Sequence, residues 1–215
     1  MSDRSSDSLA VHYVLLGSGG DFTFGVLDAL IKAWKPPQAF IRPPGQTNVV
    51  DQGIADITLE VPRPDSTLAG LLQAHHIPHH VADNNTLAEQ IAALKVDFLL
   101  VACWPRLLPL RVIQSVSKGA LNLHPSLLPR YRGRDPIRDQ LAARDYHFGI
   151  SLHLLNDAYD AGDLVSQQSL SVPDGSYQQI EKACARIGAQ LFIEAVKTYD
   201  HPGWSLRPQH SLVSN

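Results

Sequence analysis

An asparagine and a histidine stand two residues apart at the end of an apolar run. The run Gly119–Leu123 predicts a strand, so the side chains of Asn122 and His124 should point to the same face. Pro125 and Pro129 then end the strand and stiffen the loop, because proline fixes φ and lacks a backbone donor. An amide and an imidazole would therefore converge at the end of this strand.

A carboxylate later in the chain makes a catalytic interpretation stronger. Without it, a structural polar pair at a strand end would explain Asn122 and His124 equally well. Asp160 lies between two predicted extended segments and is followed by Gly162. A glycine turn there can bring the carboxylate over the strand ends, where open α/β sheets bind ligands. Amide, imidazole and carboxylate together form a general acid–base set with an oxyanion donor.

The elements that would position these residues alternate between strand and helix patterns. This alternation predicts an α/β fold with a mostly parallel sheet and helices on both faces. Apolar and polar residues alternate from Gly149 to Leu155, after the Asn122–His124 strand, which predicts that the sheet becomes mixed there. Ser176 is a good N-cap for a last helix. The segment from Pro43 to Pro64 is either an inserted hairpin, with a strand at Ile57–Val61, or a mobile loop. The predicted strands lie at 11–16, 39–42, 81, 98–102, 119–123, 149–155 and 164–172, and the helices at 22–34, 68–75, 86–94, 136–143 and from 176.

Composition limits the class of protein. The chain has 215 residues, 44% of them hydrophobic, and a formal net charge of −3, which predicts one core and no general attraction to nucleic acid. No apolar stretch approaches the roughly 20 residues that cross a bilayer, and the N-terminus lacks a signal-peptide core. We therefore expect a soluble cytoplasmic protein. Cys103 and Cys184 have no partner spacing, which favours reduced, mostly buried thiols.

Two further patterns suggest binding, and a third does not. The turn Gly17-Ser18-Gly19-Gly20 is more consistent with the lining of a substrate pocket than with a nucleotide site, because Phe22 stands where a third glycine would be needed. The four arginines at 130, 132, 134 and 138 fit either an anion-binding patch or a solvated loop. The histidines between 75 and 80 fit solvated turns, and no metal site is expected.

At Asn122-x-His124-x-Ser126-Leu127-Leu128-Pro129 and Asp160-x-Gly162 the chain resembles the folate-dependent formyltransferases. This family includes glycinamide ribonucleotide transformylase, methionyl-tRNA formyltransferase and the sugar N-formyltransferases. The resemblance spans about Val11 to Tyr199 and implies a Rossmann-like formyltransferase fold. It also implies that Asn122, His124 and Asp160 act on 10-formyltetrahydrofolate, the co-substrate, without a metal.

The resemblance further implies two folate-binding segments. Trp104, Pro105, Arg106, Leu107 and Leu108 match the pterin-side loop, and Asn156 to Gly162, including Asp157, match the second folate loop. On the acceptor side we expect contacts from the turn Gly17, Ser18, Gly19 and Gly20, and from Ser126, Arg132 and Arg134.

The acceptor itself stays open. The loop Gly17-Ser18-Gly19-Gly20-Asp21 departs from the phosphate loop of the purine enzyme, and Arg132-Gly133-x-x-Pro136-Ile137 looks more like the methionyl-tRNA and sugar enzymes. We expect transfer of a formyl group to a primary amine of a small, anionic acceptor. Glycinamide ribonucleotide transformylase, a 10-formyltetrahydrofolate hydrolase and a non-catalytic folate-binding module are the alternatives.

The expected organisation is a disordered tail at 1–10, a catalytic domain at 11–199 and a loosely ordered tail at 200–215. No C-terminal barrel of the kind found in the tRNA enzyme is expected, and without it we do not expect a nucleic-acid partner. A membrane partner is not expected either. The oligomeric state stays open, with a homodimer as one option.

Overall fold

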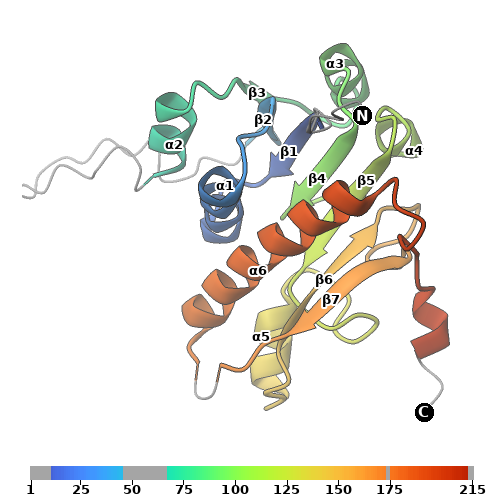
Figure 1. Ribbon diagram of the computed structural model, residues 1–215. Helices are drawn as coiled ribbons and strands as arrows, with labels where there is room; N and C mark the ends of the chain where they lie inside the picture. Colours follow the sequence, from blue (N-terminus) through green and yellow to red (C-terminus); the bar gives the residue numbers. More distant parts are fainter. Residues whose placement is uncertain (1–10, 46–66, 173–174, 213–215) are drawn as a thin grey trace, which may run out of the picture.

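The computed structural model describes residues 11–45, 67–172 and 175–212 (Figure 1). The predicted tail at 1–10 lies outside these residues. So does most of the segment from Pro43 to Pro64, including the strand predicted at Ile57–Val61.

A single seven-stranded sheet forms the centre of the fold, in the order β3-β2-β1-β4-β5-β6-β7. The first five strands in this order, from β3 through β5, are parallel to one another. Strand β6 is antiparallel to β5, and β7 is antiparallel to β6. This confirms the predicted α/β class and the change to a mixed sheet after the motif. The strands are β1 (Tyr13–Gly17), β2 (Ala39–Arg42), β3 (His79–Val81), β4 (Phe98–Ala102), β5 (Gly119–His124), β6 (Gly149–Leu154) and β7 (Leu164–Ser169).

Most helices begin and end near the predicted residues. Ser176 caps the last one, since its hydroxyl accepts from the Gln179 N–H while the Gln179 side chain accepts from the Ser176 N–H. The short α4 was not predicted, because four residues carry too little periodicity. The helices are α1 (Asp21–Ala33), α2 (Leu68–Ala74), α3 (Leu87–Leu94), α4 (Leu110–Ile113), α5 (Pro136–Ala142) and α6 (Tyr177–Thr198).

Helices cover both faces of the sheet, and the alternation of side chains along β5 decides which face carries the motif (Figure 1). Leu121 and Leu123 belong to the core cluster that includes α1 and α6. Ala120 belongs to the second cluster, with residues of α3 and α4. Because side chains alternate along a strand, Asn122 and His124 point to the same face as Ala120, away from α1 and α6.

Residues 200–212 of the C-terminal segment make defined contacts with the sheet, which the lack of periodicity in this segment does not predict. Leu164 at the start of β7 forms an antiparallel bridge with Arg207, with both N···O distances at 2.9 Å. A 3-10 turn, η2 (Gln209–Leu212), follows, and Gln209 is only 2% exposed. A single bridge leaves no repeating pattern in the sequence, so periodicity could not reveal it.

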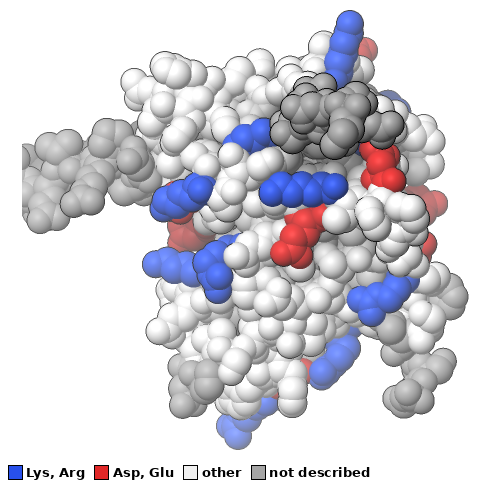
Figure 2. All heavy atoms as spheres, in the orientation of Figure 1, with Lys and Arg blue, Asp and Glu red and all other residues white. Residues whose placement is uncertain are grey.

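The hydropathy of the helices, the surface charge and the two cysteines bear on the expectations from composition. No helix among the described residues is long and apolar enough to cross a membrane. On the face shown in Figure 2, lysine and arginine side chains are scattered and interspersed with acidic ones. The two cysteines are free; Cys184 is buried as predicted, whereas Cys103 is exposed.

Candidate active site

The structure brings Asn122, His124 and Asp160 together. Oδ1 of Asp160 lies 3.5 Å from Nδ2 of Asn122 and 3.4 Å from Nδ1 of His124. Asn122 and His124 occupy alternate positions of β5, whereas Asp160 belongs to the loop between β6 and β7. An amide, an imidazole and a carboxylate thus meet around one oxygen atom.

Both ring nitrogens of His124 face oxygen atoms. Nε2 lies 2.8 Å from the Tyr131 carbonyl oxygen, and Nδ1 faces the Asp160 carboxylate. The doubly protonated ring can donate to both oxygens, whereas either neutral tautomer can donate to only one. Each ring nitrogen of His124, which is 4% exposed, therefore has an oxygen acceptor within reach.

The Asp160 carboxylate is held in its ionised form. Its Oδ2 accepts from the Gly133 N–H at 3.0 Å. Burial by itself would raise the pKa of Asp160, but the hydrogen bond and charge of His124 and the Gly133 hydrogen bond outweigh burial and lower it. The group can therefore accept a proton only transiently near neutral pH.

His153 is a fourth polar residue of the cluster. It pairs with Asn122 across β5 and β6, and Nδ2 of Asn122 lies 3.0 Å from its Nε2. Its Nδ1 lies 2.8 Å from the Leu154 carbonyl, so Nδ1 carries the proton and Nε2 accepts from the amide. Burial lowers the pKa of His153 to about 4, which keeps this acceptor neutral. The polar position of His153 within an apolar strand was the available sequence signal.

Gly162 is required by the path of the Asp160 loop. A Cβ atom at this position would lie 1.8 Å from the Leu154 carbonyl oxygen. The loop can therefore pass this close to the end of β6 only with glycine, which explains the spacing Asp160-x-Gly162 in physical terms.

The two predicted folate segments lie next to each other. The Tyr159 hydroxyl accepts from the Leu107 N–H at 3.0 Å, which joins the segment 104–108 to the segment 156–162. Pro105, Arg106 and Asp157 are exposed, Trp104, Leu107 and Asn156 are half-buried, and Gly162 is buried. Leu108 is 4% exposed and packs in the core near Val112, so its side chain is not placed to contact a ligand.

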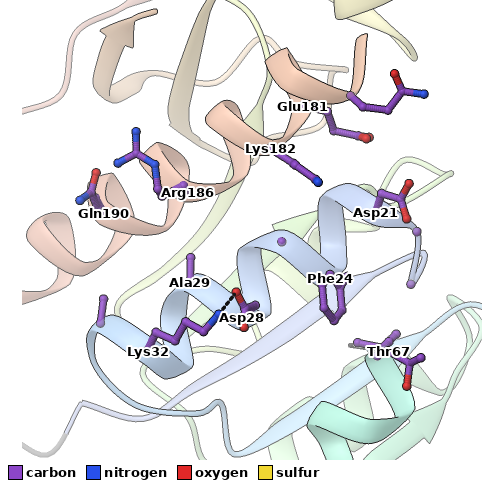
Figure 3. Close-up of a pocket in the computed structure, with 16 residues that line it drawn as sticks. Asp21, Phe24, Asp28, Ala29, Lys32, Thr67, Glu181, Lys182, Arg186 and Gln190 are labelled. Atoms are coloured by element: carbon purple, nitrogen blue, oxygen red, sulfur yellow. Dashed lines mark hydrogen bonds and ion pairs between the residues drawn. The ribbon is translucent and has the colours of Figure 1, made fainter. Parts of the chain in front are cut away.

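The predicted acceptor residues do not gather at one point. Ser126 is fully buried, and its hydroxyl donates to the Arg130 carbonyl at 2.7 Å, so it supports the loop after β5. Gly17 packs against Thr23 and the Ala102 carbonyl. Gly19 and Gly20 line one end of a cavity of about 950 Å³ between α1 and α6 (Figure 3). The residues that line this cavity do not include the Asn122 cluster.

The arginines after His124 mostly bind within the protein. Arg130 pairs with Asp145, and Arg138 pairs with Asp135. Arg132 donates from Nε and Nη2 to the Gln209 side chain. Arg134 is exposed and makes no ion pair or hydrogen bond with the described part of the chain. Three of the four arginines after His124 therefore bind side chains within the protein and are not free to bind a ligand.

Asp145→Asn is expected to destabilise the fold by about 2 kcal/mol near neutral pH, since charge-assisted hydrogen bonds contribute about this much. Asp145 accepts from Arg130, Tyr131 and the His147 N–H. Burial would raise the pKa of Asp145, but these hydrogen bonds lower it to about 2. A lowered pKa contributes stability above the unfolded value of about 3.9 and loses it as pH falls toward the folded value.

Thermal unfolding measured from pH 7 down to pH 2 checks this prediction. The difference between wild type and Asp145→Asn should shrink between about pH 4 and pH 2. Asp200→Asn is the matched control, because Asp200 forms an exposed pair with Lys118 and its side chain is 62% exposed. An Asp145 variant that unfolds like this control would show that these hydrogen bonds are unimportant.

Sequence and structure comparisons place the chain among known proteins. Methionyl-tRNA formyltransferase from Carboxydothermus hydrogenoformans is 34% identical over 133 residues, which cover 61% of this chain and 43% of that enzyme. The chain thus spans less than half the length of this relative.

Solved structures share the fold at low identity. Glycinamide ribonucleotide transformylase 1 from Symbiobacterium toebii has a TM-score of 0.67 at 18% identity and covers 92% of this chain and 93% of its own. The N-formyltransferase from Helicobacter canadensis, in complex with folinic acid and dTDP-3-aminofucose, has a TM-score of 0.62 at 16% identity. The match covers 95% of this chain and 70% of that enzyme's chain. A family model described as formyl transferase matches residues 52–196. Because that match spans more than half of the chain, the protein belongs to the formyl transferase family.

Proposed function

We propose that this protein transfers the formyl group of 10-formyltetrahydrofolate to a primary amine of a small acceptor. The observation that carries the proposal is the cluster in which Asn122 and His124 both lie within 3.5 Å of one oxygen of Asp160. The cluster supplies donors for a developing oxyanion and a carboxylate for proton transfer. Membership of the formyl transferase family supports the same reaction.

In the proposed reaction the amine nitrogen attacks the formyl carbon, and the carbonyl electrons move to the oxygen. Asn122 and the His124 imidazolium would stabilise that oxyanion, with one donor contributing about 3 kcal/mol. The carbon–N10 bond then breaks, and the electron pair goes to the folate nitrogen. Asp160, directly or through water, would carry the proton from the attacking amine to that nitrogen.

The hydrogen bonds of Asn122 suit this task. Its bond to His153 is short, at 3.0 Å, whereas its contact with Asp160 is 3.5 Å long. The long contact is weak and can be exchanged for a formyl oxygen at little cost. His153 meanwhile fixes the orientation of the amide, so we assign it a positioning role in the same reaction.

The folate is proposed to bind at the segments 104–108 and 156–162. The Trp104 indole Nε1 and the Asn84 Oδ1 are buried and have no hydrogen-bond partner among the described residues. Asn84 also contacts this region, since its Nδ2 donates to the Leu107 carbonyl at 3.0 Å. Unpartnered buried polar atoms are costly, and the polar edge of a pterin offers the donors and acceptors that would satisfy them.

Leu107→Asp is expected to weaken binding of folinic acid tenfold or more. The half-buried Leu107 side chain would be replaced by a carboxylate, whose desolvation beside the ligand is costly. Leu110→Asp is the control, because Leu110 is 51% exposed on α4, outside both segments. Calorimetric titration of wild type and both variants measures the effect. Equal affinity in all three proteins would place the folate elsewhere.

The acceptor is proposed to be a small amine that carries phosphate or carboxylate, with its non-reacting part near the turn Gly17 to Gly20. Gly19 and Gly20 line the cavity beside the N-terminus of α1, where backbone N–H groups favour an anion. Of the two arginines expected on the acceptor side, Arg132 is engaged by Gln209 and Arg134 is exposed, so Arg134 is the one proposed to assist.

An acceptor screen tests the function. Wild-type protein is incubated with 10-formyltetrahydrofolate and, in separate reactions, glycinamide ribonucleotide, amino-sugar nucleotides, methionyl-tRNA and simple phosphorylated amines, and release of tetrahydrofolate is followed. Turnover that requires one of the amines supports the proposal. Release of formate at the same rate without an amine would indicate a hydrolase. Folate binding without turnover under any condition would indicate a non-catalytic module.

A further inference from the structure

Gln209 connects the C-terminal segment to the loop that carries Asp160. Its Nε2 donates to the carbonyl oxygens of Asp160 at 2.9 Å and of Gly162 at 2.7 Å. Its Oε1 accepts from Nε of Arg132 at 3.1 Å and from Nη2 at 2.6 Å. One side chain thus joins three segments that are far apart in sequence.

These contacts use the whole hydrogen-bonding capacity of an amide. A glutamine side chain offers two N–H donors and one oxygen with two lone pairs, and all four are engaged. Gln209 is also 2% exposed, so water does not compete for these bonds. A carboxylate could not donate to the two carbonyls, and an aliphatic side chain would leave them unpaired.

The backbone fixes where Gln209 sits. The bridge between Arg207 and Leu164 aligns the C-terminal segment with the first residue of β7, four residues after Asp160. Gln209 follows Arg207 by two residues and therefore reaches back over the loop. Two independent attachments, the bridge and the amide, hold this segment against the Asp160 loop.

We propose that Gln209 is a positioning residue for Asp160, and that the C-terminal segment thereby forms part of the active site. This inference rests on the proposed function. Gln209 touches no reacting atom in this assignment. It acts by holding the Asp160 backbone, so that the carboxylate stays in contact with His124 and Asn122.

The geometry of the loop gives the hydrogen bonds from Gln209 a reason to matter. Asp160 has a φ of 50°, in the left-handed region that residues other than glycine seldom occupy, although aspartate does so more readily than most. Its carboxylate contacts with Asn122 and His124 are long, at 3.5 and 3.4 Å, whereas the Gly133 N–H at 3.0 Å and the two backbone bonds from Gln209 are short. We expect the long contacts to depend on the bonds that hold the loop in place. A displacement of about 1 Å at such a site can reduce the rate by up to about a hundredfold.

Gln209→Met is the first test, with Val196→Ala as the control for lost stability, because Val196 is buried on α6 away from the cluster. With the amine identified by the acceptor screen, Gln209→Met should lower kcat about tenfold and change both KM values less. Val196→Ala should leave kcat nearly unchanged. Gln209→Glu keeps an acceptor for Arg132 but cannot donate to the carbonyls, and it should resemble Gln209→Met.

The pH profile separates positioning from general stability. The titratable groups that face Asp160 are His124 from β5 and His153 from β6, and the charge of Arg132, from the loop after β5, acts on His153. When the loop loosens, the carboxylate moves away from His124 and the Gly133 N–H, so the acidic limb of kcat/KM should move to higher pH by about half a unit or more. Val196→Ala should not move it.

Hydrogen exchange of residues 155–163 provides a readout that does not depend on activity. Exchange should be faster in both Gln209 variants than in Val196→Ala. If wild type transfers no formyl group, the proposed function fails. The exchange measurement would still test whether Gln209 holds the Asp160 loop. If wild type is active and the Gln209 variants match Val196→Ala in kcat, pH profile and exchange, the positioning role is refuted.

Discussion

Replacing Asn122 with alanine is expected to lower kcat by about a hundredfold or more, while the affinity for folinic acid stays close to that of wild type. The amide would donate to the formyl oxygen mainly in the transition state, so its loss raises the barrier rather than weakening ground-state binding. Asn122 is half-buried between His153 Nε2 and the Asp160 carboxylate, which both accept from it and so cannot take over its donor role. Steady-state kinetics and calorimetric titration measure the two quantities.

Asn85→Ala is the matched control, because Asn85 is exposed and lies outside the cluster. It should change neither kcat nor folate affinity. An Asn122 variant with unchanged kcat would remove the amide from the mechanism. A variant that lost folate affinity in proportion to kcat/KM would instead make Asn122 a binding residue.

Asp160→Asn should reduce kcat about a thousandfold, within the range known for general acid–base groups. The substitution keeps the size of the side chain but removes the charge that compensates a protonated His124 at 3.4 Å. It also removes the proton carrier. Kinetics with the acceptor identified by the screen give the magnitude.

The pH dependence identifies the role of this carboxylate. The pKa of Asp160 lies below its ordinary value, so the acidic limb that its protonation gives to wild-type kcat/KM should lie below the ordinary aspartate pKa of about 3.9. Asp160→Asn should lack this limb, whereas the exposed Asp139→Asn should keep it and full activity. An Asp160 variant that retains the wild-type profile and rate would contradict the proposed proton transfer.

Local patterns were enough to predict much of the fold. The apolar runs of β4 and β5 and the helical stripe of α6 are visible in sequence because each element buries a regular set of its own side chains. The alternation along β5 also placed Asn122 and His124 on one face, as the structure shows. Such features depend on residues that are close together in the chain.

Features that depend on distant partners were harder to predict. His153 reaches Asn122 only through the register of β5 and β6, and Gln209 reaches Asp160 and Arg132 across separations of 49 and 77 residues. Arg132 has the sequence appearance of an anion ligand, yet the same donors are satisfied by Gln209. Residue type alone cannot distinguish a ligand from an internal partner, because the chemistry of the hydrogen bond is the same.

The setting of Trp104 also has an optical consequence. The chain has three tryptophans; Trp34 stacks with Tyr13 at a centroid distance of 5.4 Å, and Trp204 lies against Tyr199 at 4.9 Å. Trp104 has no such ring contact among the described residues, and its indole N–H, like that of Trp204, is buried without a hydrogen-bond partner there. A pterin that bound there would change the fluorescence of Trp104 much more than that of the other two. A Trp34→Phe/Trp204→Phe protein would therefore carry a single tryptophan, at the folate segment, and selective excitation of it would suit stopped-flow detection of ligand binding without any added label.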